Sequence, residues 1–225
     1  MLKPKKKMKR HDIKEDKFVK FTLQAKGYFD ENYQTIMRAA IGLGIVAVIV
    51  VFYIFNTRET NREANSQLGI AEIEFANGNL SKASERLIKL IDEYDGTDAA
   101  NQGMFLLADI YYQQKKYADA RVYFERFVNK YSGSNILLAS GYAGLASCAE
   151  VDGEYLNAAE LYERAADLAP DFIESDNYYY SSGLCYKNAN EIEKARSIFK
   201  YLASDAKTSA RINDAEIQLV LLGNK

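Results

Sequence analysis

The chain has 225 residues, of which 48% are hydrophobic and 27% are charged, and its formal net charge is −2. This apolar content excludes a wholly disordered chain, and the length suffices for one or two domains. The presence of only two prolines and the lack of β-type alternation favour an all-helical protein. Residues 1–38 hold eleven Lys and Arg against five Asp and Glu, whereas residues 56–225 hold 18 against 26, so the two ends are suited to different surroundings.

Residues 1–35 are expected to form a basic cytoplasmic tail. The first eleven residues could be read as a nucleic-acid-binding tail or a nuclear signal, but beside an apolar segment the simpler interpretation is a topology determinant attracted to anionic lipid headgroups. Residues 13–36 place apolar side chains at helical spacing among lysines, which predicts an amphipathic helix on the cytoplasmic leaflet, with a partner-binding helix as the alternative. The residues expected at the membrane surface are Lys14, Lys17, Phe18, Lys20, Phe21, Lys26 and Phe29.

Residues 36–56 are predicted to form a transmembrane helix. Within them the run AAIGLGIVAVIVVFYIF, residues 39–55, has no charge. A helix of this length spans about 25 Å, which approaches the roughly 30 Å core of a bilayer when flanking residues are included. A buried core helix and a cleaved signal peptide are the alternatives, but the run is apolar on every face and 38 residues precede it. We therefore expect an uncleaved single-pass anchor, with the lysine-rich flank in the cytoplasm and residues 57–225 on the far side.

A short pattern recurs four times in residues 57–225, as GNLSKASERLIKL, KKYADARVYFERF, GEYLNAAELYERA and NEIEKARSIFKYL. Each copy carries one apolar stripe at helical spacing. The alanines at a common point of the stripe are 37, 38 and 37 residues apart, namely Ala83, Ala120, Ala158 and Ala195. A near-constant period of this size is typical of stacked helical repeats.

A second helical segment precedes each copy and completes a repeat unit of two helices. Small residues at 108, 146 and 183 would face the small residues at 120, 158 and 195 and let two antiparallel helices approach closely. Gly78 and Gly153 suit the turn between the two helices, and Asn190 is a tolerable substitute. Residues 207–223 are expected to form a helix that caps the open end of the stack.

The third unit carries the most informative residues, which are Tyr142, Leu145, Ala146, Gly153, Tyr155, Ala158, Tyr162, Ala165 and Pro170. They closely resemble the signature of the tetratricopeptide repeat, a helix-turn-helix unit. Units two and four differ from it at the turn glycine and lack the closing proline, and the first unit is degenerate. The expected fold is therefore all-α, with a single N-terminal transmembrane helix, a tetratricopeptide-like α-solenoid of about four helix pairs and a C-terminal capping helix.

The resemblance also implies a groove that binds peptide segments of protein partners. In tetratricopeptide domains this groove is lined by first-helix positions outside the packing stripe, and aromatic side chains there provide contact area for extended or helical peptides. An alternative for each ring is that it packs between helices. Transferred to this sequence, the groove positions are Leu68, Phe75, Phe105, Asp109, Tyr112, Glu150, Tyr180, Lys187 and Asn188.

No catalytic, cofactor or metal site is predicted, and neither a nucleic acid nor a small-molecule substrate is expected. The only histidine is His11 in the tail, and the chain has no phosphate-binding glycine loop and no metal-ligand spacing. Cys148 and Cys185 occupy the same point in neighbouring repeats, where an exported domain could oxidise them. The distance between packed helices favours buried free thiols instead.

The order of basic tail, single span and acidic repeat domain resembles the bacterial ancillary subunit of the Sec translocon, an inner-membrane protein whose periplasmic repeats work with chaperones on newly translocated chains. This resemblance implies a non-catalytic, holdase-like scaffold in the bacterial inner membrane, with its N-terminus in the cytoplasm and its repeats in the periplasm. A dedicated accessory subunit or assembly factor of one membrane protein complex is the main alternative. An outer-envelope or division scaffold related to the coordinator proteins that carry similar repeats is a third.

Overall fold

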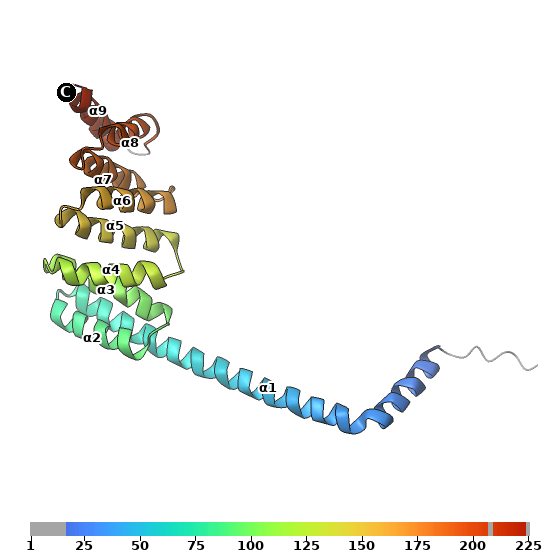
Figure 1. Cartoon of the computed structure of the whole chain (residues 1–225). Helices are drawn as coiled ribbons and strands as arrows, with labels where there is room; N and C mark the ends of the chain where they lie inside the picture. The colour runs from blue at the N-terminus through green and yellow to red at the C-terminus, as the bar shows by residue number, and fades with distance from the viewer. Residues whose placement is uncertain (1–16, 207–208, 224–225) are drawn as a thin grey trace, which may run out of the picture. The chain divides into compact units, whose positions relative to one another are not determined.

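The computed structural model describes residues 17–206 and 209–223, whose regular structure consists of nine α-helices (Figure 1). The bounds are α1 Lys17–Ala76, α2 Leu80–Glu93, α3 Asp98–Gln113, α4 Tyr117–Lys130, α5 Asn135–Val151, α6 Tyr155–Leu168, α7 Ser175–Asn188, α8 Ile192–Asp205 and α9 Ser209–Gly223. The prediction of an all-α fold is confirmed. The chain divides into two compact units, residues 1–57 and 58–225, and α1 runs through the boundary between them. The predicted bounds 1–35, 36–56 and 57–225 stay predictions.

The first unit contains the part of α1 that precedes residue 58. Within the described residues, α1 is the one helix that is long and apolar enough to cross a membrane. Its most apolar stretch is not buried, since the side chains of Leu43 and Phe52 are 72% and 73% exposed. A helix that is apolar on every face is otherwise typical of a protein core, where such side chains would be covered.

The predicted membrane-surface residues belong to the same unit. Lys14 lies outside the described residues. The others lie on α1, where Phe21 and Phe29 are exposed. Contact of these residues with lipid stays a prediction.

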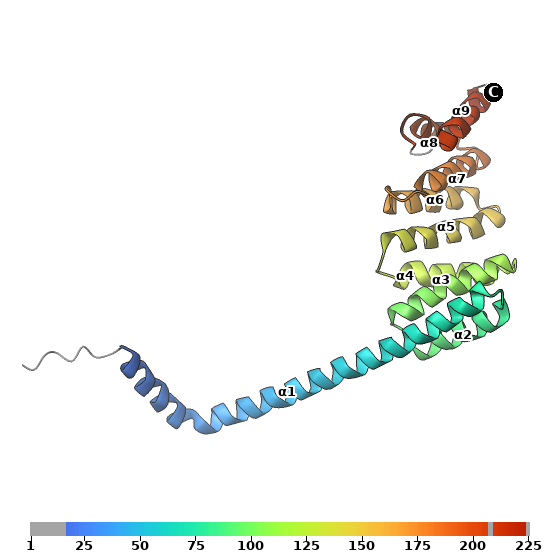
Figure 2. The ribbon, with the colours of Figure 1, turned by 180° about the vertical axis from the view of Figure 1, so that it is seen from behind.

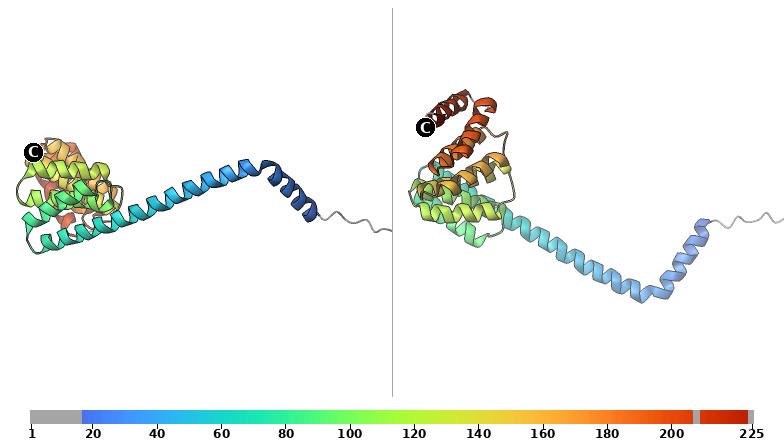
Figure 3. Two further views of the ribbon diagram at one scale, coloured as in Figure 1. Left: turned by 90° about the horizontal axis from the view of Figure 1, so that it is seen from below. Right: turned by 45° about the horizontal axis from the view of Figure 1, so that its top comes forward.

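The second unit is a stack of helix pairs. Residues 58–76 of α1 pair with α2, and the further pairs are α3 with α4, α5 with α6 and α7 with α8, with α9 against α8. Figures 1 and 2 show α2 to α9 following one another along the stack, and Figure 3 gives two further views. The predicted four helix pairs and terminal helix are therefore confirmed.

The core of the stack lies along the alanine stripe. Ala83, Ala120, Ala158 and Ala195 are completely buried. A close approach occurs at Gly183 as predicted, but the side chain that lies against Gly183 is the ring of Phe199 and not the small residue at position 195. A Cβ atom at Gly183 would lie 2.7 Å from Cε1 of the buried Phe199, so the aromatic side chain fills the space that glycine leaves.

The turn between the two helices of each unit has one conformation throughout the stack. Gly78, Lys115, Gly153 and Asn190 have φ values of 77°, 60°, 77° and 63°. In each turn the following residue donates its N–H to the carbonyl oxygen five residues back, as in the bond from Lys116 N to Tyr111 O at 2.9 Å. This hydrogen bond is typical of helices that end with a residue in the left-handed conformation. The predictions at Gly78, Gly153 and Asn190 are confirmed, and Lys115 adopts the same conformation without a glycine.

Candidate partner-binding surface

The first helices of the units form one layer, which we call the first-helix face and define as residues 58–76 of α1 with α3, α5, α7 and α9. Along this layer α3 contacts α5, and α7 contacts α9. Side chains bridge α5 and α7, since the Ser140 and Tyr178 hydroxyl oxygens are 3.5 Å apart.

Three of the nine predicted groove residues pack in the core of the first two units. Leu68 is only 6% exposed, and Phe75 and Phe105 are partly buried against the same cluster. The ring centroid of Phe105 lies 5.9 Å from that of Phe124 and 5.4 Å from that of Phe127. Leu68 therefore offers a partner little surface, and Phe105 contributes mainly to packing.

The next three predicted residues, Asp109, Tyr112 and Glu150, are partly exposed on α3 and α5. Asp109 Oδ2 accepts a hydrogen bond from Gln113 Nε2 at 2.9 Å, and burial raises the pKa of this carboxyl group. Burial also raises the pKa of the Tyr112 hydroxyl. Glu150 Oε2 accepts a hydrogen bond from the Tyr162 hydroxyl at 3.3 Å. Neither carboxylate pairs with a lysine or arginine in the described part of the chain.

The last three predicted residues lie on α7, and the terminal helix contacts two of them, which stay partly exposed. The Arg211 guanidinium lies 4.7 Å from the ring centroid of Tyr180, and Lys187 Nζ donates to Gln218 Oε1 at 2.8 Å. Asn188 is exposed. The contacts that Arg211 and Gln218 make with α7 were not predicted, although the 38 residues that separate Tyr180 from Gln218 match the repeat period.

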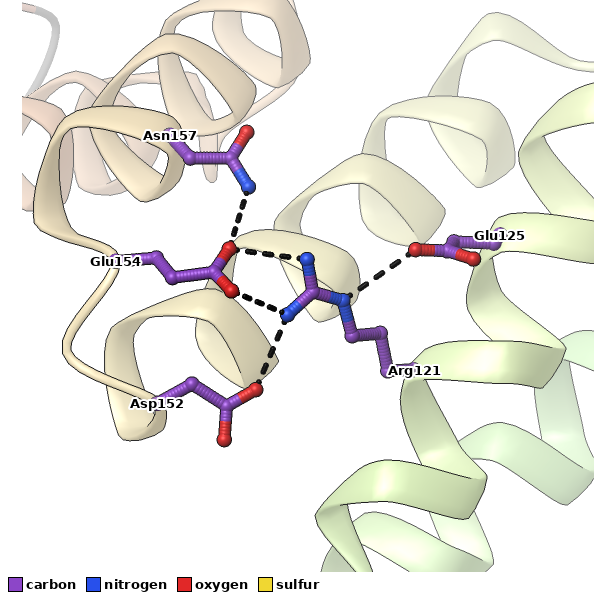
Figure 4. A network of polar contacts seen from close by, with 5 residues as sticks. All are labelled: Arg121, Glu125, Asp152, Glu154 and Asn157. Atoms are coloured by element: carbon purple, nitrogen blue, oxygen red, sulfur yellow. Dashed lines mark hydrogen bonds and ion pairs between the residues drawn. The ribbon is translucent and has the colours of Figure 1, made fainter.

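A cluster of charged residues joins the second and third units away from the first-helix face (Figure 4). Arg121 Nη1 and Nη2 each donate to one carboxylate oxygen of Glu154 at 2.9 Å, and Nη1 also donates to Asp152 at 3.1 Å. Arg121 Nε donates to Glu125 at 3.3 Å, and Asn157 donates to Glu154 at 3.0 Å. The hydrogen bonds from Arg121 lower the pKa of Glu154. This two-pronged arginine contact fixes α4 against the turn between α5 and α6.

The two cysteines are free and buried. The pKa of the Cys148 thiol is raised to about 11 and that of the Cys185 thiol to about 12, and burial is the largest cause of both shifts. Because the thiolate is the reactive form, both thiols are poor nucleophiles near neutral pH. No group of three or more histidine, cysteine, aspartate or glutamate side chains is arranged to hold a metal ion in residues 17–206 and 209–223.

Residues 68–135 match the family model of the tetratricopeptide repeat. Among solved structures, a set of nearly identical TPR-like repeats from Podosopora anserina is similar with a TM-score of 0.56 and 14% identity, and the match covers 72% of this chain and 86% of that one. A tetratricopeptide repeat protein from Parabacteroides merdae gives a TM-score of 0.59 at 17% identity, over 72% of this chain and 60% of that one. The fold is a tetratricopeptide-like solenoid. Comparison with curated protein sequences gave no match.

The tetratricopeptide-like fold indicates the general class of function. Solenoids of this kind bury a continuous core and leave an extended surface, which generally serves as a non-catalytic scaffold for protein partners. The predicted tetratricopeptide-like solenoid is therefore confirmed. The binding role of each individual groove residue stays a prediction.

Proposed function

We propose that this protein is a single-pass protein of the bacterial inner membrane whose tetratricopeptide-like domain holds exported polypeptides beside the translocon, without catalysing a reaction. The observation that carries the proposal is the exposed, charge-free segment 39–55 of α1, which continues as one helix into the first repeat. A soluble protein would hide such a segment, whereas a lipid bilayer covers it without further protein.

The charge distribution supports one orientation in the membrane. Residues 1–38 carry an excess of six positive charges, and positive flanks remain on the cytoplasmic side. Lysines of the same segment are attracted to anionic lipid headgroups. The acidic repeat domain would then lie in the periplasm, where newly translocated chains emerge.

The first-helix face supports a role in binding polypeptides. Tyr112, Glu150 and Tyr180 are partly exposed there, so aromatic surface and hydrogen-bonding groups occur together. Tyrosine contributes a large contact area at a small loss of side-chain freedom, and carboxylates accept hydrogen bonds from peptide and side-chain donors.

Affinity purification of the full-length protein from gently solubilised native membranes, followed by quantitative mass spectrometry, tests this function. Tyr112→Ala is the test variant, because Phe105 packs against core rings. Tyr155→Ala is the matched control, since Tyr155 is an exposed tyrosine on α6 and lies outside the first-helix face. A third sample lacks residues 1–30.

The proposal predicts recovery of translocon components together with many exported proteins. Tyr112→Ala should lower the yield of exported proteins, whereas Tyr155→Ala should not. Recovery of one stoichiometric complex that is unaffected by Tyr112→Ala and lost without residues 1–30 would replace the proposal with a dedicated subunit of that complex. Digestion of the repeat domain by protease added to intact cells with a permeabilised outer membrane checks the orientation.

A further inference from the structure

The terminal helix α9 carries apolar side chains on two sides. On one side Ala215 and Leu222 are buried in the core of the last units. On the other side Ile217, Val220 and Leu221 are 57%, 63% and 53% exposed. The element that ends a solenoid normally turns a polar outer surface to water. The second apolar side of α9 is therefore unusual for a helix in this place.

This side of α9 is open because the stack ends there (Figures 1 and 3). The preceding first helix, α7, contacts α6, α8 and α9. In contrast, α9 packs on α8 and α7, and no helix follows it in the described residues. We call the open side the end face and define it as Asn213, Glu216, Ile217, Val220 and Leu221. It is the surface that a further helix of the stack would cover.

The end face has the shape of one half of a helix pair. Its five residues line a hollow of about 400 Å³. Four of them, Asn213, Glu216, Ile217 and Val220, are spaced i, i+3, i+4 and i+7 along α9. Residues at this spacing form the hole that receives one side chain of a facing helix in knobs-into-holes packing. Since Glu216 is the one charged residue of the lining, an apolar side chain suits the hole.

The end face also supplies such a side chain. Leu221 lies about one helical turn beyond the centre of the hole. When a second α9 is placed antiparallel on the first, a two-fold axis brings Leu221 of each copy over the hole of the other. The interface is then isologous, because the same residues serve on both sides. Each copy contributes one charge, Glu216, and the antiparallel arrangement separates these two carboxylates by more than one turn along the helices.

The size of the end face favours a partner that is held in the same membrane. Three apolar side chains on one helix cover much less than the roughly 800 Å² that each partner buries in a standard interface. Such a contact is weak between two proteins that meet in bulk solution. Two copies anchored in one membrane meet at a raised effective concentration, which strengthens a weak contact without any new interaction.

From the open apolar surface, the hole and its self-complementary shape, we infer that the end face joins two copies of this protein, with α9 of one copy packed antiparallel on α9 of the other. This inference rests on the proposed function only for the membrane anchor that the two copies share. It concerns a different surface from the one proposed to hold exported polypeptides.

Co-purification of two differently tagged full-length copies from gently solubilised native membranes tests the inference. The Lys variant, Ile217→Lys/Leu221→Lys, places like charges on both sides of the contact. The Glu variant, Ile217→Glu/Leu221→Glu, supplies the opposite charges. The matched control, Val122→Lys/Val151→Lys, adds the same charge at valines that are 52% and 48% exposed on α4 and α5. Because all four side chains are exposed, the circular dichroism of each variant should match that of the unmodified protein.

The two unmodified copies should co-purify. Two copies of the Lys variant should lower the recovery of the second tag by about fivefold or more, because like charges then meet across the two-fold axis. One copy of the Lys variant with one copy of the Glu variant should restore the recovery, since these charges attract. The control should co-purify as the unmodified protein does.

Cysteine cross-linking in native membranes gives a second measurement that adds no charge. Val220→Cys should yield a cross-linked dimer with a short bismaleimide, whereas Val122→Cys, at a similarly exposed valine on α4, should not. The unmodified protein sets the background, which should be low because Cys148 and Cys185 are buried.

Co-purification that the Lys variant does not reduce, or that the mixed Lys and Glu pair does not restore, would overturn the inference. Loss of a different protein from the Lys variant, in samples where the two copies never co-purify, would also overturn it and assign the end face to that protein. If exported proteins are recovered in a Tyr112-dependent manner but the copies do not pair, only the inference fails. If the copies pair through α9 but no exported protein is recovered, the proposed function fails and the inference stands.

Discussion

Gly141 on α5 permits a single-methyl test of the packing between the second and third units. A Cβ atom at this position would lie 2.4 Å from Cε1 and 2.5 Å from Cδ1 of Phe127. Phe127 is completely buried, and its ring stacks on Tyr131 with the centroids 4.8 Å apart. The ring therefore has no free space into which it could move, and Gly141→Ala should strain the contact between α4 and α5.

Two opposing effects set the magnitude. Alanine is favoured over glycine in a helix interior by about 1 kcal/mol. Overpacking of a filled core typically costs about 1–3 kcal/mol, and the confined ring at Phe127 places this site in the upper part of that range. Gly141→Ala should therefore lower the free energy of unfolding by about 1–2 kcal/mol. Phe127→Leu removes the ring and with it the overpacking, so the double variant should be more stable than the sum of the two single effects by about 2–3 kcal/mol.

Urea denaturation of the full-length protein in detergent, followed by far-UV circular dichroism, measures these differences. Gly69→Ala is the matched control, because nothing outside the neighbouring backbone of its own helix lies within 4 Å of the added Cβ, and only helix propensity acts. It should raise the free energy of unfolding by about 0.5–1 kcal/mol. If Gly141→Ala stabilises the protein as Gly69→Ala does, or if Phe127→Leu does not relieve its effect, the packing described here is refuted.

Three further outcomes are expected. Arg121→Met should lower the thermal midpoint of unfolding. Because Arg121 lowers the pKa of Glu154 in the folded protein, this loss of stability should shrink as the pH falls from 4.5, the ordinary pKa of glutamate, through the lowered pKa of Glu154. Thermal melts in a series of acidic buffers measure this dependence. Cys148 and Cys185 should resist alkylation at neutral pH in the folded protein and react in urea, as mass spectrometry would detect; fast labelling of the folded protein would contradict their burial. Lys115→Gly should raise the free energy of unfolding by about 1 kcal/mol in urea titrations, since a left-handed lysine is strained, and a loss of stability would count against the turn geometry.

Local signals in the sequence account for much of the architecture. The period of 37 and 38 residues follows from apolar side chains that recur at helical spacing, and a helix that carries such a stripe must cover it with a neighbour. The left-handed turns at Gly78 and Gly153 depend on the backbone freedom of single residues. Lys115 was not predicted there because its own conformational preference opposes the turn, and the packed helices on either side hold it in place.

Whether a predicted surface residue joins the core, contacts another helix or stays exposed depends on neighbours that the local sequence pattern does not reveal. Leu68 was predicted for the groove, but this side chain joins the core of the first two units. Tyr180 and Lys187 contact α9, whose docking depends on residues more than thirty positions away. The sequence by itself determined the repeats, their turns and the apolar segment, because these depend on local periodicity and backbone preference. Only the tertiary structure decided which charges pair and which stay open, because a charge is satisfied by residues from other repeats.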